Sequence, residues 1–517
     1  MIRVIGIAEA LGPAERYGLD VLLDLSRLLV LTADAPSDPS ARPASLDVGA
    51  RAVGVRIVPD SDAAGSLRDR PGALADSLEI HDGDVLMPRA VLRAVCEIAG
   101  GAVEQRSDAR DRFDRVPSAA NPLVIAGCER DPVVSRLAIA LRRRVMAAAG
   151  RRPVFSAAPW PGGHRWAAAL THDLDVASLW PAFTGLRVAE LLRKRRVGDV
   201  ARVLGAAAGA LAGDPVLDGV RGVVDAERRI GAAATWFVLC GTPTFATVRR
   251  GDLTYRPESR RVRRIVALLR EAGHELALHG SFATAGGSAV FEAQRARLGA
   301  LLAGAPPRGV RQHYLRMRPG AAQRAMTAAG FTYDATYGFP DRNGFRLGTA
   351  DVVPGWDDRD ARPIALDEVP LVWMDRAQSK YQGIEDPTRW IEDALALARA
   401  VREVDGLWVG LWHPNLTPPL GFPGAPAAYA RLVEAIASEA PFIASVESIV
   451  AWRRARRHVH AAVTRDGAIV VRRRADVGVP TEPTSPRCDV PVGIEDAAGR
   501  PVVELRGGKA AAAPLPH

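Results

Sequence analysis

Two aspartates and a histidine lie within four residues of one another in the segment Thr171-His172-Asp173-Leu174-Asp175. The apolar run before it, 166–170, has the character of a buried strand. Side chains alternate along a strand, so Asp173 and Asp175 would point the same way and could reach one metal ion and one water molecule. This arrangement indicates hydrolase chemistry. The alternative interpretation is that Asp175 only caps the N-terminus of a helix.

Four later segments repeat this design, in which a strand-like apolar run ends in a residue able to bind a metal or carry a proton. The four runs end at His279, His313, Asp334 and His413. In barrel enzymes the carboxyl ends of parallel strands meet at one mouth and carry the catalytic residues there. The series therefore predicts one site built from the ends of several strands.

The region from 164 to 456 alternates strand candidates with helical stretches, which predicts an α/β domain with a largely parallel sheet or barrel. The helical stretch 260–272 ends at Gly273, a typical residue at the end of a helix. Seven strand candidates can be counted in this region: 166–170, 234–239, 275–278, 309–313, 332–335, 368–373 and 407–412.

The rest of the chain carries no catalytic signature. Its composition changes at a Pro/Gly-rich stretch before residue 164 and again after residue 456, where short strands follow one another around turns. The predicted parts outside the central domain are an N-terminal mixed α/β accessory domain (1–150), a linker (151–163), a small C-terminal β module (457–507) and a disordered tail (508–517).

Composition bounds the class of protein. The chain has 517 residues, of which 48% are hydrophobic and 25% charged, with a net charge of +9. The basic residues are spread over the sequence and predict solvated faces, with peripheral contact to the inner face of a membrane as an alternative. No motif indicates nucleic-acid binding, and no pattern predicts an oligomeric state.

The cysteines and the N-terminus bear on location. The four cysteines are far apart, which favours neither a structural zinc site nor a disulfide framework. No signal peptide is apparent, and no apolar run approaches the roughly 18 residues of a spanning helix. We therefore expect a cytoplasmic protein without an integral membrane segment.

Taken in order, the five segments resemble the motifs of the polysaccharide deacetylase superfamily, also called the NodB-homology superfamily or carbohydrate esterase family 4. The resemblance covers residues 160–455, and the phrases at 309–316 and 344–349 resemble a bacterial branch associated with surface-polysaccharide loci. It implies a distorted (β/α) barrel of about seven strands. It also implies one divalent metal ion that activates water to remove an acetyl group. We expect zinc as this metal, with cobalt, iron and nickel as alternatives.

The resemblance implies roles for the metal-binding residues. Asp173 matches the general base, and Asp175 and His279 match two metal ligands. Many family members have a second histidine four residues after the first, but this chain has Ala283 there. The third ligand is therefore open between His313, Ser281 and a water molecule, with a pocket-shaping role as the alternative for His313.

The remaining motif residues match groups that orient the base and protonate the leaving amine. Arg311 matches the arginine expected to pair with the base. Asp334 matches the carboxylate expected to pair with His413, the general acid. A carboxylate held against an imidazole raises its pKa and keeps a proton available.

Three residues are predicted to contact the substrate. Leu411 lies two residues before the histidine of the last motif and would line a pocket for the acetyl methyl group. Tyr314 and Trp412 could stack on sugar rings, although core packing is the commoner use of such aromatic side chains.

The predicted function is that of a carbohydrate deacetylase acting on a linear amide bond. The substrate would be an N-acetylated sugar or glycan precursor, linked to a lipid or nucleotide, in the biosynthesis of a cell-surface glycan. Two alternatives remain: a hydrolase of non-sugar C–N bonds in small amides, and a catalytically inactive glycan-binding or scaffold protein on the same fold.

Overall fold

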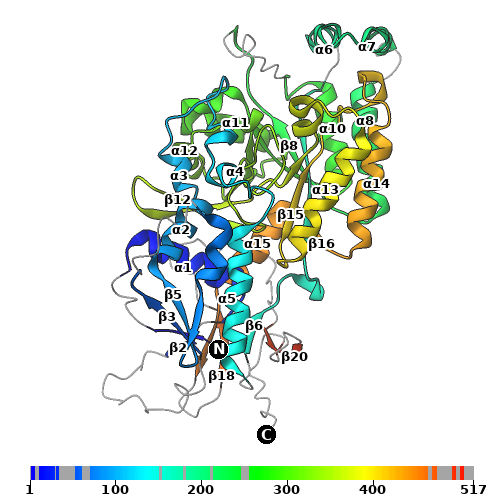
Figure 1. Ribbon diagram of the computed structural model, residues 1–517. Coiled ribbons are helices and arrows are strands. Elements are labelled where there is room, and N and C mark those ends of the chain that lie inside the picture. The colour runs from blue at the N-terminus through cyan, green and yellow to red at the C-terminus, as the bar shows by residue number, and fades with distance from the viewer. Residues whose placement is uncertain are drawn as a thin grey trace. The chain divides into compact units, whose positions relative to one another are not determined.

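The computed structural model describes most of the chain (Figure 1). The described residues are 2–5, 11–29, 31–33, 53–60, 70–150, 154–177, 182–209, 214–245, 255–463, 469–473, 492–495 and 501–505. The chain divides into two compact units. The first comprises Met1–Gly100, Pro132–His164 and Val450–His517, and the second comprises Gly101–Asp131 and Arg165–Ile449. None of the described helices is both long and apolar enough to cross a membrane.

The first unit contains a four-stranded sheet with helices packed against one another. Helix α1 (Pro13–Ser26) contacts α2 (Arg89–Ala99) and α5 (Val133–Ala149). Gly18 lets α1 approach α2 closely, because a Cβ there would lie 2.0 Å from the Leu92 carbonyl oxygen. The sheet has the order β1 (Ile2–Ile5), β3 (Val53–Val58), β5 (Asp84–Pro88) and β4 (Glu79–His81).

The C-terminal strands pair with strands from the N-terminal part of the chain. β17 (Val459–Val463) pairs with β18 (Ile469–Arg473) and also with β2 (Leu31–Ala33). β19 (Val492–Glu495) lies between β20 (Pro501–Leu505) and β6 (Val154–Ala157).

These strand pairings cross the boundaries of the predicted domains. The segment 457–507 does not pair only within itself, and the predicted linker 151–163 contains β6. Residues 101–131, predicted in the accessory domain, cluster with the second unit. Backbone pairing between segments hundreds of residues apart leaves no local signal in the sequence. The predicted tail 508–517 lies outside the described residues.

The second unit is built on a curled sheet of ten strands, all parallel except the antiparallel pair β12–β13 at one edge. The predicted α/β class and distorted barrel are thereby confirmed. The path runs β12 (Val353–Asp357), β13 (Arg362–Glu368), β11 (Tyr333–Asp334), β10 (Gly309–Gln312), β9 (Glu275–Gly280), β8 (Thr235–Leu239), β7 (Ala167–Leu174), β15 (Leu407–Leu411) and β14 (Trp373–Met374), with β16 (Phe442–Ile443) beside β7.

Six of the seven predicted strands of this region lie where strands are found. The seventh, 368–373, instead runs from the end of β13 to the start of β14. All eight residues of β7 are buried, which explains its continuous apolar character, because strands of a covered parallel sheet are buried on both faces.

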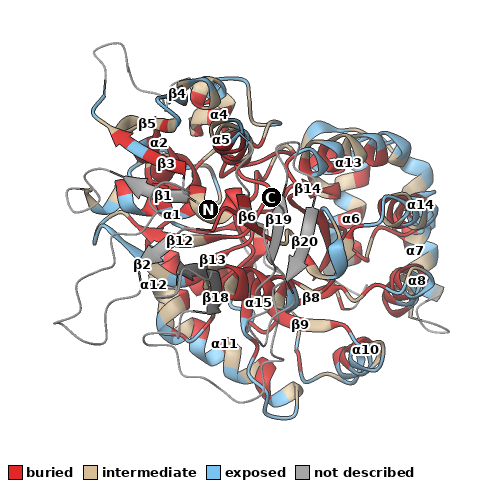
Figure 2. Cartoon of the chain, turned by 90° about the horizontal axis from the view of Figure 1, so that it is seen from below, coloured by how far each residue is buried: buried red, intermediate tan, exposed pale blue. Residues whose placement is uncertain are grey.

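Helices cover the outer face of this sheet, and neighbouring helices contact one another (Figure 1). In α10 (Arg260–Glu271) the buried residues recur at helical spacing, and Ser259 caps the N-terminus of the helix. These buried residues are Val262, Ile265, Val266 and Leu269. Figure 2 shows the strands buried and the helices exposing their outward faces. The neighbouring helices on this face are α13 (Pro387–Arg402), α14 (Ala425–Ser438), α8 (Pro215–Arg229) and α10 (Arg260–Glu271).

A buried ion pair ties residues 101–131 into the second unit. Glu104, in α3 (Ala102–Gln105), accepts hydrogen bonds from Arg346 Nε at 2.9 Å and Nη2 at 2.8 Å, and both side chains are 3% exposed. Arg346 also donates to the Gly338 and Val116 carbonyls. The pair is therefore fully hydrogen-bonded, which a buried charge requires.

We expect Glu104→Gln to lower the free energy of unfolding by about 3–5 kcal/mol, because Arg346 would be left buried without its counterion. Urea unfolding of the full chain measures this. The matched control Glu292→Gln removes an exposed carboxylate from α11 (Ser288–Leu301) and should change the midpoint little. Equal effects of the two substitutions would contradict the role of the ion pair.

Candidate active site

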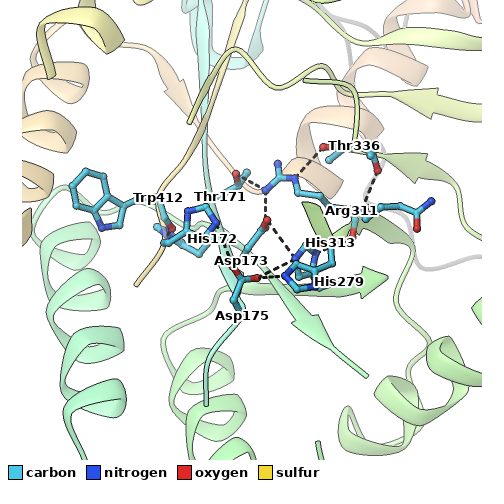
Figure 3. Close-up of polar contacts among 12 residues, drawn as sticks. Thr171, His172, Asp173, Asp175, His279, Arg311, His313, Thr336 and Trp412 are labelled. Atoms are coloured by element: carbon cyan, nitrogen blue, oxygen red, sulfur yellow. Dashed lines mark hydrogen bonds and ion pairs between the residues drawn. The ribbon is translucent and has the colours of Figure 1, made fainter. Parts of the chain in front are cut away.

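The site lies where the strands of the second unit end (Figure 3). Asp175 directly follows β7, and His279 lies near the end of β9. His313 directly follows β10, and Arg311 of β10 is the register partner of His279. The parallel register thus brings side chains together that are far apart in the sequence.

Asp175, His279 and His313 form a compact group of possible metal ligands. Each offers one ligand atom, and the three atoms lie within 4.8 Å of one another. His279 Nε2 is 3.2 Å and His313 Nε2 is 3.6 Å from Asp175 Oδ1. The sequence analysis proposed the same residues as ligands, with His313 as one candidate for the third position, and their role as ligands stays a prediction.

The protonation of His279 bears on what this group can hold. Its Nδ1 lies 2.9 Å from the Arg311 carbonyl oxygen, so this nitrogen carries the donated hydrogen. In the neutral ring Nε2 then presents a lone pair toward Asp175 Oδ1, and neither atom has a hydrogen-bond partner among the described residues. Two acceptors can face each other only with a positive charge between them, either a proton or a metal ion.

The pKa values reflect the same contact. Burial opposes the charged form of both groups, but the neighbouring charges outweigh it. Asp173 and Asp175 raise the pKa of His279, and the three histidines His313, His279 and His413 lower the pKa of Asp175. A carboxylate and two imidazoles form an O,N,N donor set that fits a divalent cation such as zinc.

Asp173 is held by Arg311 as predicted from the motif. Arg311 Nη1 donates to Asp173 Oδ1 at 3.0 Å and to Thr171 Oγ1 at 2.9 Å, and its Nε donates to the Ala335 carbonyl. Asp173 Oδ2 lies 3.6 Å from His279 Nε2. One oxygen of Asp173 is therefore fixed by the guanidinium, while the other faces the candidate metal ligands.

His413 is held by Asp375, which the sequence analysis missed. Asp375 Oδ1 lies 2.6 Å from His413 Nδ1, and Asp375 Oδ2 accepts from the His413 amide at 2.6 Å. Burial lowers the pKa of His413, but Asp375 outweighs it and the pKa is raised. Its Nε2 points the other way, 3.5 Å from Asp175 Oδ2.

The predicted pairing of Asp334 with His413 is wrong. Asp334 ends β11, which is separated from β15 by β10, β9, β8 and β7 in the sheet. Asp375 instead follows β14, the neighbour of β15 on its other side. A signal for it was available, because the run 371–374 before Asp375 is another apolar run ending in a carboxylate.

Asp334 belongs to a buried pair of carboxyl groups. It is the register partner of Glu368 on the parallel strand β13, so the two side chains share one face of the sheet. Asp334 is 0% and Glu368 is 3% exposed. Burial raises the pKa of Asp334 to about 7, although Thr336 donates to it. Burial and then Asp334 raise the pKa of Glu368 well above its usual value.

The predicted substrate residues occupy different environments. Trp412 is 3% exposed, and its ring packs with Trp373 and Tyr429 in the core, so it cannot stack on a sugar. The alternation of β15 turns it away from His413. Tyr314 is half-buried, and its ring stacks on His313 at 4.0 Å between centroids. Leu411 is buried on the His413 side of the strand, and its pocket role stays a prediction.

His172 joins the end of β7 to the end of β15. Its Nδ1 lies 2.8 Å from the Trp412 carbonyl oxygen. Its Nε2 lies 2.7 Å from Glu227 Oε1, which also accepts from the Tyr429 hydroxyl. This fully buried network joins the residue before Asp173 to the residue before His413.

Among the comparisons with known proteins, the one with solved structures found similar chains. No protein-family model and no curated protein matches the sequence. A solved structure described as a polysaccharide deacetylase from Mycobacterium smegmatis is similar, with 22% identity, a TM-score of 0.40, and coverage of 59% of this chain and 96% of that chain. One from Pseudomonas aeruginosa has 15% identity, a TM-score of 0.38, and coverage of 58% and 94%. At these scores the matches assign neither a substrate nor a mechanism.

We expect Glu368→Gln to stabilise the protein more at about pH 8 than at about pH 5. A carboxyl group with a raised pKa contributes stability that is present below its unfolded pKa and lost as the pH rises through its folded pKa, about 7 for Asp334. Removing one of the two acids removes this loss of stability. The loss in the free energy of unfolding is about 1.4 kcal/mol for every tenfold difference in proton affinity between the folded and unfolded states.

Urea midpoints of wild type and variant at the two pH values test this expectation. Glu392→Gln on α13 is the matched control, since this carboxylate is exposed and should give the same small change at both values. A change for Glu368→Gln that does not depend on pH would exclude a protonated pair.

Proposed function

We propose that the protein is a metal-dependent hydrolase that removes an acetyl group from an N-acetylated sugar, in the biosynthesis of a cell-surface glycan. The observation that carries the proposal is that a candidate metal site, a candidate base and a candidate acid lie together at the ends of the strands. Asp175 is shared between the candidate ligands His279 and His313, and it also faces the imidazole of His413. A binding protein has no need of a base, an orienting cation and an acid together.

The divalent cation held by Asp175, His279 and His313 would supply Lewis-acid activation of water at neutral pH. Zinc suits one carboxylate and two imidazoles best. Asp173 acts as the general base through Oδ2, which is free of the arginine and turned toward the ligands. Arg311 keeps Asp173 oriented through its hydrogen bond to Oδ1.

His413 acts as the general acid for the leaving amine. Asp375 fixes Nδ1–H, which sets the tautomer and leaves Nε2 to carry the proton toward the substrate. The raised pKa of His413 keeps that proton on the ring until the C–N bond breaks. Leu411 would bound the acetyl methyl group, and a pocket of this kind rejects each extra methylene by roughly 1–3 kcal/mol.

The location of the protein and the chemical form of its sugar substrate are also part of the proposal. We infer a cytoplasmic precursor, such as a lipid- or nucleotide-linked sugar. Peripheral contact with the inner face of a membrane fits the net charge of +9.

We expect wild type to hold about one divalent metal ion per chain and to release acetate from N-acetyl sugars. Asp175→Ala, His279→Ala and His313→Ala should each lose the metal and the activity, because each removes a ligand. Metal content by mass spectrometry and acetate release are measured on the same samples. Asp173→Asn is the control, since it should keep the metal but lower kcat by about 10²–10⁴.

Two outcomes would contradict the proposal. Wild type without metal after reconstitution, and without acetate release, would leave a binding protein. Hydrolysis of small non-sugar amides in preference to N-acetyl sugars would keep the chemistry and reject the substrate class.

We expect Asp375→Asn to lower kcat by about 10²–10⁴ while the metal content is unchanged, because His413 loses the carboxylate that sets its tautomer. Asp334→Asn should lower kcat less than about tenfold, since Asp334 has no contact with His413 among the described residues. The reverse order of the two effects would show that Asp334, not Asp375, supports the acid.

A further inference from the structure

Two basic residues lie shortly after Asp375, the residue that holds His413. Arg376 is the neighbour of Asp375, and Lys380 lies in a π-helical turn, Ala377–Gln382. Such turns occur often at functional sites. Arg376 is half-buried and Lys380 is exposed, so the chain presents both near the carboxyl end of β14.

Lys380 lies one aromatic ring away from the candidate metal ligand His313. Its Nζ is 5.7 Å from the ring centroid of Tyr314, which stacks on His313 at 4.0 Å. Tyr314 adopts a positive φ of 61°, a strained conformation for a residue with a side chain, and it holds its ring against His313 there. One ring thus separates the ammonium group from a predicted ligand.

A third cation reaches the same aromatic stack from residues 101–131. The Arg112 guanidinium carbon lies 4.7 Å from the centroid of the Phe113 ring, and that ring stacks on Tyr314 at 5.0 Å. Arg112 is exposed. We call Arg112, Arg376 and Lys380 the cation rim.

The charges of the cation rim are not balanced within the part of the chain that the structure describes. None of its three side chains has a carboxylate within 4.0 Å there. The acidic side chain Glu190, which attracts Lys380, is already paired with Arg187 at 2.6 Å and Lys194 at 3.3 Å.

The neighbouring charges also affect the pKa of Lys380. Desolvation of the amine, and then the charges of Arg376 and Arg112, lower its pKa to about 8, although Glu190 and Asp175 act in the opposite direction. Unbalanced cations around a mouth attract anions. Planar guanidinium groups and an ammonium group are the side chains that bind phosphate oxygens.

We propose that the substrate is a phosphorylated N-acylated sugar, whose phosphate binds the cation rim while the acyl group reaches the strand ends. This inference rests on the proposed function for the acyl group but not for the anion. A phosphate carries about −1.5 to −2 charges and three acceptor oxygens, which suits three cations better than a single carboxylate would.

The first experiment measures binding of inorganic pyrophosphate to the metal-loaded full chain by calorimetry. Lys380→Gln and Arg376→Gln should each weaken binding by about tenfold, the usual size for a lost charged hydrogen bond. Arg431→Gln, which removes a cation from α14, is the matched control and should leave binding unchanged. Asp175→Ala should retain binding, because the anion is held by the rim.

Loss of pyrophosphate binding in Asp175→Ala with retention in Lys380→Gln would assign the anion to the metal ligands and overturn the inference. So would equal weakening by Arg431→Gln, which would indicate attraction to net charge only.

The second experiment separates the inference from the proposed function. N-acetylglucosamine 1-phosphate should bind at least about tenfold more tightly than N-acetylglucosamine, and Lys380→Gln should bring the ratio close to one. Equal affinities with acetate release would overturn the inference and keep the deacetylase. A preference for the phosphorylated sugar without acetate release in any metal-loaded sample would keep the anion site and reject the deacetylase.

Discussion

The buried guanidinium of Arg311 is the interaction on which the arrangement of the strand ends depends. A charge that is fully buried is tolerated only when its surroundings supply partners. Arg311 finds them in Asp173, the Thr171 hydroxyl and the Ala335 carbonyl, and its guanidinium carbon lies 4.2 Å from the Phe237 ring centroid. These partners come from β7, β8 and the end of β11. One side chain of β10 therefore fixes the base and aligns the strands around it.

Strand alternation is a local rule, and what followed from it was predictable. It placed Asp173 and Asp175 on one side of β7, and both lie within 3.6 Å of His279 Nε2. The same rule, applied to β15, would have excluded Trp412 from the mouth, since it must face away when His413 faces inward. The error there came from weighing the aromatic type above its position in the strand.

The sequence offers both Asp334 and Asp375 as carboxylates after apolar runs, but it cannot decide which of them pairs with His413, because that choice depends on the order of strands in the sheet. The chain visits β11 before β14, yet the sheet places β14 beside β15 and β11 five positions away. Motif order alone therefore selected Asp334. The same reason explains the C-terminal strands, whose partners β2 and β6 lie more than 300 residues earlier along the chain. Long-range pairing leaves no periodic trace in either segment.

Charge is divided between the centre of the site and its edge. At the centre the carboxyl groups of Asp173 and Asp175 face the candidate ligand His279, and carboxylates so close would offset much of the charge of a divalent cation. Such a centre favours water activation but offers little attraction to an anionic substrate. We propose that the cation rim supplies that attraction, and the Tyr314 ring separates Lys380 from His313. In the proposed arrangement the edge selects the substrate, while the groups at the centre hold the metal ion and move the protons.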